Sequence, residues 1–78
     1  MASEHIYKQF DSDLGGIRTK LLEMGTIVEE QISNSVLSMI ESDTKLANEV
    51  IDRDSEVNSL ESVINEDISL IIAKRSPT

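Results

Sequence analysis

The sequence predicts an all-α protein made of two long antiparallel helices. Apolar residues recur at steps of three and four over two long stretches, as expected for amphipathic helices. A short polar segment at residues 42–44 interrupts this pattern, and no stretch has the two-residue alternation of a strand. The polar break is too short to allow any arrangement other than a hairpin.

The first helix is expected over about residues 4–41. Its early apolar steps approximate a coiled-coil seam, whereas later steps of four make the stripe drift around the helix, which favours a packed bundle. Gln31 and Ser35 lie near this stripe and mark a partly wet layer. Gly15 and Gly16 each cost about 0.5–1 kcal/mol relative to alanine, so packing must hold them helical or the helix kinks there. The apolar positions are Ile6, Phe10, Leu14, Ile17, Leu21, Met24, Val28, Ile32, Val36 and Met39.

A turn is expected at residues 42–43 and a second helix over about residues 44–74. Ser42 or Asp43 can cap this helix by accepting hydrogen bonds from its first free N–H groups. Lys74 and Arg75 favour the negative end of the helix dipole, and Pro77 prevents continuation.

The second helix carries an apolar wedge roughly 80° wide, which needs a partner. Its members are Leu46, Val50, Val57, Leu60, Ile64, Ile68 and Ile71. Along one border of the wedge, four side chains that bear oxygen follow at i, i+4, i+7 and i+11, so they form one column. This polar column consists of Asp54, Asn58, Glu61 and Asn65, and it could hold a cation.

A hairpin covers only part of each apolar stripe, because one neighbouring helix meets a stripe along a narrower seam. A third helix from a longer chain, or a second copy forming a four-helix bundle, would complete the core. Both alternatives stay open from the residues alone.

Composition excludes several functions. The 78 residues make one small domain at most, and the net charge of −8 is concentrated in residues 29–67, with eleven acidic residues against Lys45 and Arg53. Nucleic-acid binding is not expected, since it requires clustered Lys and Arg. There is no cysteine and no apolar run long enough to span a membrane, and we expect no signal peptide because the first residues lack a basic segment followed by an apolar run. His5 has no second histidine as a partner, and no nucleophile motif or phosphate loop is present, so we expect no enzyme.

Two motifs are specific when taken together. They are FD..L..IR..L..MG..VE.Q in the first helix and VI..D..VN.LE..I.E....IIA.R.P in the second. With them the chain resembles the PhoU family of accessory and regulatory proteins of bacterial phosphate transport. The resemblance implies a fold of two similar three-helix bundles, of which residues 1–78 would form the first two helices, a partial PhoU-like helical domain. The third helix would then follow the present chain.

The resemblance also implies a metal site. PhoU-like proteins carry acidic residues four apart that bind clusters of iron or related divalent metals, and the match here is Asp54 with Asn58, with Glu61 as a further ligand. Iron, manganese or magnesium is expected in the full-length protein, and an incomplete site in this chain. A solvated or capping role for these side chains is the structural alternative.

The function implied by the resemblance is negative regulation of phosphate uptake and phosphate-starvation signalling. Such a regulator is cytoplasmic and usually homodimeric, contacts the phosphate ABC transporter ATPase and the phosphate-sensing histidine kinase, and meets the membrane only through these partners. The alternative is a complete, self-associating helical hairpin with a structural or adaptor role.

Overall fold

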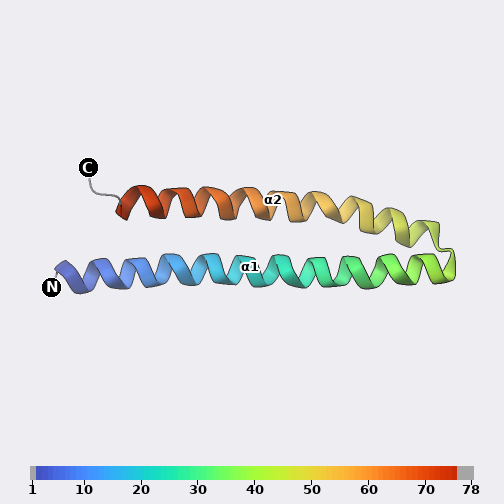
Figure 1. Cartoon of the computed structure of the whole chain (residues 1–78), viewed down its shortest axis with the longest axis horizontal. Helices are drawn as coiled ribbons and strands as arrows, with labels where there is room; N and C mark the ends of the chain where they lie inside the picture. The colour runs from blue at the N-terminus through green and yellow to red at the C-terminus, as the bar shows by residue number, and fades with distance from the viewer. Residues whose placement is uncertain (1, 76–78) are drawn as a thin grey trace.

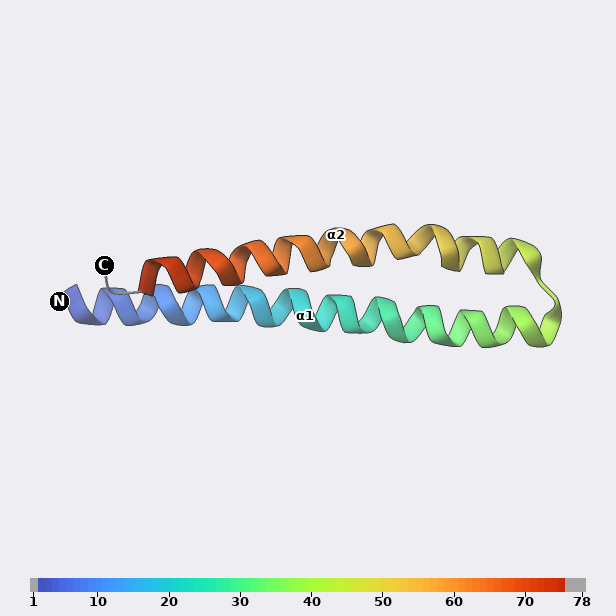
Figure 2. The same ribbon diagram turned by 45° about the horizontal axis from the view of Figure 1, so that its top comes forward.

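The computed structural model describes the backbone of residues 2–75 and the side chains of residues 8–75. Two helices, α1 (Ala2–Glu41) and α2 (Thr44–Arg75), lie side by side and antiparallel, as Figures 1 and 2 show. The hairpin measures 60 × 20 × 12 Å, and residues 2–75 contain no strand. The predicted all-α fold with two long antiparallel helices is confirmed.

Helix α1 runs without a break through Gly15 and Gly16 (Figure 1), so the kink considered from the sequence does not occur. Neither glycine has a positive φ. The Thr19 hydroxyl donates a hydrogen bond to the Gly15 carbonyl at 3.0 Å. Because a 40-residue helix rises about 1.5 Å per residue, α1 alone accounts for the length of the molecule.

The turn between the helices is short, and its residues both end α1 and begin α2. The Asp43 N–H donates to the Ser38 carbonyl at 2.8 Å and the Ser42 N–H to the Met39 carbonyl at 3.4 Å, the pairing of a Schellman motif. Ser42 occupies the left-handed position of that motif, with φ 51°. Asp43 caps α2 by accepting the Leu46 N–H at 3.0 Å. Of the two caps that the sequence allowed, Asp43 is the one used.

Helix α2 turns its predicted wedge toward α1. Ile64 is the most buried member, at 4% exposed, and Ile68 at the edge of the wedge is exposed. The other members, Leu46, Val50, Val57, Leu60 and Ile71, are half-buried. The wedge is therefore the contact face of α2, although a single neighbour leaves most of its side chains partly open.

Helix α1 buries its apolar stripe only in part. Phe10, Ile17 and Met24 are half-buried, and the buried apolar residue of α1 is Ile27, at 4% exposed, which the predicted stripe did not include. Farther along, the stripe turns away from α2 and is exposed at Val28, Ile32, Val36 and Met39. The cause is the run of four-residue steps, which moves the stripe around the helix.

Polar side chains take the place of the stripe in the second half of the seam. Ser38 is 7% exposed, and its hydroxyl donates to the Ser35 carbonyl at 2.8 Å. The Ser35 hydroxyl donates to the Gln31 carbonyl at 2.6 Å. Gln31 is half-buried and bonds across to α2. The polar side chains of Gln31 and Ser35 therefore lie in the seam, near the stripe as expected.

One edge of the seam is closed by ion pairs between the helices. Lys20 pairs with Asp67, and the Lys74 ammonium lies 3.9 Å from the Asp13 carboxylate. Arg53 pairs with Glu30 on the facing helix. The Glu30 hydrogen bond raises the pKa of the Arg53 guanidinium above its usual value, so this side chain stays charged at every pH of interest. We call this side of the hairpin the ion-pair edge.

We predict that Ile64→Ala lowers the free energy of unfolding by about 2 kcal/mol, near the low end for buried isoleucines because only one helix packs on it. Ile51→Ala, at an exposed position of the same helix, is the matched control and should change it by less than about 0.5 kcal/mol. Chemical denaturation followed by circular dichroism measures both. Equal losses in the two variants would contradict the seam described above.

We predict that Ser42→Gly raises the free energy of unfolding by about 0.5–1 kcal/mol, because glycine adopts the left-handed conformation without the steric cost that serine has there. Ser33→Gly, in the middle of α1 and exposed, should lower it by a similar amount. The same denaturation measurement applies. A loss of stability in Ser42→Gly would show that the turn has a different backbone.

Candidate functional site

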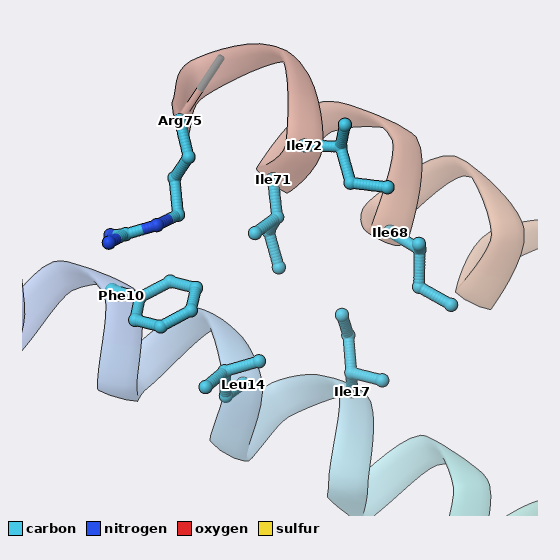
Figure 3. Close-up of a pocket in the computed structure, with 7 residues that line it drawn as sticks. All are labelled: Phe10, Leu14, Ile17, Ile68, Ile71, Ile72 and Arg75. Atoms are coloured by element: carbon cyan, nitrogen blue, oxygen red, sulfur yellow. The ribbon is translucent and has the colours of Figure 1, made fainter.

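The side of the seam opposite the ion-pair edge is apolar and open. A groove lies there near the free ends of the helices, and Figure 3 shows side chains of both helices facing one another across it. Its lining residues are Phe10, Leu14, Ile17, Ile68, Ile71, Ile72 and Arg75. A second hollow, on the ion-pair edge, is lined mainly by polar side chains, among them Asp13, Lys20 and Asp67. The two edges of the hairpin therefore differ sharply in character.

Arg75 closes the end of the apolar groove. Its guanidinium lies over the Phe10 ring, 3.8 Å from the ring centroid, and Figure 3 shows the two side chains meeting between the helices. A cation over an aromatic face is attracted by the ring quadrupole. This contact joins the last turn of α2 to the first third of α1.

The open side continues along α1 well beyond the groove. Leu14, Leu21, Val28, Ile32 and Met39 follow at intervals of seven, seven, four and seven residues, which places them on one face of the helix. All five are exposed, Ile32 at 61%. We call these five side chains the open apolar face. Their exposed fractions range from 37% to 72%, so the described part of the chain covers them only in part.

The polar column borders this same open side. Asp54, Glu61 and Ile68 are spaced by seven residues and so share one helix face, and Ile68 lines the apolar groove. Asn58, Asn65 and Ile72 are also spaced by seven residues and share a neighbouring face of the helix, and Ile72 likewise lines the groove. The column therefore continues the apolar groove along α2, and an element that covered the open side would also meet the column.

The three residues expected to bind metal, Asp54, Asn58 and Glu61, are all exposed. Asp54 accepts a hydrogen bond from the Gln31 side-chain amide at 3.5 Å, and the same amide donates to the Val50 carbonyl at 3.4 Å. Gln31 thus makes a long hydrogen bond to the Asp54 carboxylate from the facing helix. The sequence indicated that Gln31 lies near the seam, but the contact with Asp54 depends on the register of the two helices.

These side chains offer oxygen donors of the type that magnesium, manganese and iron accept. They do not make a complete ligand set, because no group of three or more His, Cys, Asp or Glu side chains within residues 8–75 is placed to hold a metal. The column therefore fits one side of a site, and further ligands would have to come from another helix. The His5 side chain lies outside the described residues.

No helix among the described residues is long and apolar enough to cross a membrane.

The fold defines a class of protein, an all-α protein whose described residues form two long antiparallel helices. The family model of the PhoU domain matches residues 21–78, which is most of the chain. The chain belongs to the PhoU family.

Relatives are similar to nearly the whole chain. The phosphate-specific transport system accessory protein PhoU of Serratia marcescens is 45% identical over 76 residues, which are 97% of this chain and 31% of the relative. The protein of the same name from Escherichia coli is 43% identical over 76 residues, 97% of this chain and 32% of the relative. The Pseudomonas putida homologue is 39% identical over 75 residues, 96% of this chain and 29% of the relative. The chain spans about a third of the length of these relatives, and no solved structure shows significant similarity to it.

Proposed function

We propose that the protein containing this chain is a negative regulator of phosphate uptake and of phosphate-starvation signalling. The observation that carries the proposal is an identity of 43–45%, over 76 of the 78 residues, to accessory proteins of phosphate-specific transport systems. We propose that it acts in the cytoplasm as a homodimer, without catalysis, by contacting the phosphate ABC transporter ATPase and the phosphate-sensing histidine kinase. It would then meet the membrane only through these partners.

The open apolar face supports a role as part of a larger bundle. Exposed leucine, isoleucine and methionine side chains in a continuous row mark a surface that another element covers. The ion-pair edge is already closed by charged side chains of the hairpin, so a third helix would lie on the open side. The greater length of the relatives leaves room for such a helix in the same protein.

We propose that the polar column supplies part of a site for a divalent metal, with Asp54, Asn58 and Glu61 as ligands. The support is their placement on the side that a third helix would cover, together with the long hydrogen bond from Gln31 to Asp54. Removal of water by the covering helix would strengthen the attraction between the carboxylates and a cation. When bound, the metal would join the hairpin to the covering helix.

We predict that the intact protein copurifies with iron, manganese or magnesium, and that Asp54→Ala lowers the metal content at least severalfold. Asp52→Ala removes a nearby exposed carboxylate that lies off the column and is the matched control. Elemental analysis of the purified protein measures metal per chain, and thermal unfolding checks that both variants fold. Equal metal content in the two variants would exclude Asp54 as a ligand.

We predict that the intact protein restores repression of a phosphate-starvation reporter at high external phosphate in a bacterium lacking its own PhoU. The reporter signal should fall several-fold, and the transporter ATPase or the sensor kinase should copurify with the protein. Normal protein levels with an unchanged reporter, and a stable dimer of hairpins without these partners, would instead favour a structural or adaptor role.

A further inference from the structure

Helix α1 has an outer stripe that faces away from α2. It consists of Arg18, Leu22, Gly25 and Glu29, which follow at i, i+4, i+7 and i+11 and so lie on one face of the helix. All four are exposed, and Leu22 is 68% exposed. This stripe shares no residue with the open apolar face or with the ion-pair edge.

Gly25 has no role that the packing of the hairpin explains. It lies inside α1 with no positive φ, and a Cβ built on it meets no atom within 4 Å. Glycine inside a helix costs about 0.5–1 kcal/mol relative to alanine, and the hairpin has room for alanine. The bare backbone at this point leaves space for a side chain that approaches from outside.

The charges at the two ends of the stripe are unused. Neither Arg18 nor Glu29 makes an ion pair or a side-chain hydrogen bond with another described residue. Arg53 and Lys20, by contrast, each pair with a carboxylate of the facing helix. A cation and an anion thus stand free on either side of Leu22 and Gly25.

The stripe is complementary to itself when a second copy is turned end for end. Arg18 and Glu29 are equally distant along the chain from the midpoint between residues 23 and 24, and so are Leu22 and Gly25. About a two-fold axis at that midpoint, each Arg18 would face Glu29 of the other copy, and each Leu22 would lie over the other Gly25. In a two-fold interface every such contact occurs twice.

We infer that a second copy of this chain docks on the outer stripe, with the two α1 helices antiparallel. The charge complementarity selects a second copy over other occupants, because the stripe itself supplies both partners of each ion pair. The close approach at Gly25 lets the helices bury Leu22, which the hairpin alone leaves in water. This inference rests on the homodimer of the proposed function and names its surface. It does not depend on the regulatory role or on the metal.

Charge reversal tests the pairing. The intact protein should sediment as a dimer whose mass falls to one chain on dilution. Arg18→Glu alone and Glu29→Arg alone each set like charges opposite one another twice, and should weaken dimerisation roughly tenfold or more. The double variant restores opposite charges and should recover the dimer.

Gly25→Leu tests the close approach, because its side chain finds open space in the hairpin but meets Leu22 of the other copy. It should dissociate the dimer and leave the helical circular dichroism unchanged. Glu49→Arg, which makes the same charge change as Glu29→Arg at an exposed site on α2, should have no effect. A protein that is monomeric at all concentrations, a double variant that stays dissociated, or a dimer that survives Gly25→Leu would each overturn the inference. A dimer that is lost only in the variant Ile32→Asp, which changes the open apolar face, would also overturn the inference.

Discussion

The structure depends on the contact between two helices whose apolar stripes are wider than the seam between them. One neighbouring helix covers a narrow band, and the remaining apolar surface stays in water. Ile27 and Ile64 are buried in this band, each at 4% exposed, while the large apolar side chains flanking it stay partly exposed. The hairpin therefore has a defined seam but leaves apolar surface beside it exposed. The position of this exposed surface determines where any other element would pack.

The distribution of charged side chains shows which edge of the seam is left apolar and exposed. The ion pairs of Lys20 and Arg53 with the facing helix occupy one edge of the seam. Such exposed pairs contribute little to stability individually, but they keep that edge polar. The other edge has the apolar groove, and its free end is closed by the stacking of Arg75 on Phe10. An added helix would find the continuous row of exposed apolar side chains of α1 on this second edge.

The same register brings a polar column to the border of the open side. Gln31 on α1 reaches Asp54 on α2, which places a carboxylate where a covering helix would meet it. If the column binds metal as proposed, one covering helix would complete both the core and the metal site. The outer stripe of α1 faces elsewhere, so association of two copies there would leave the open side free.

Much of the fold was predictable from the sequence by itself. Periodicity defined two helices and the contact face of α2, the polar break at Ser42 and Asp43 defined the turn, and the spacing of Asp54, Asn58 and Glu61 defined a column on one helix edge. These features depend on neighbours within a few turns, which helical geometry places without knowledge of the rest of the molecule. Tertiary structure alone decided that Ile27 is buried while Ile32 is exposed, that Gln31 reaches Asp54, and that ion pairs close only one edge. These features depend on the register and rotation of one helix against the other. Both follow from the packing of the side chains of the two helices together, and no short stretch of sequence indicates them.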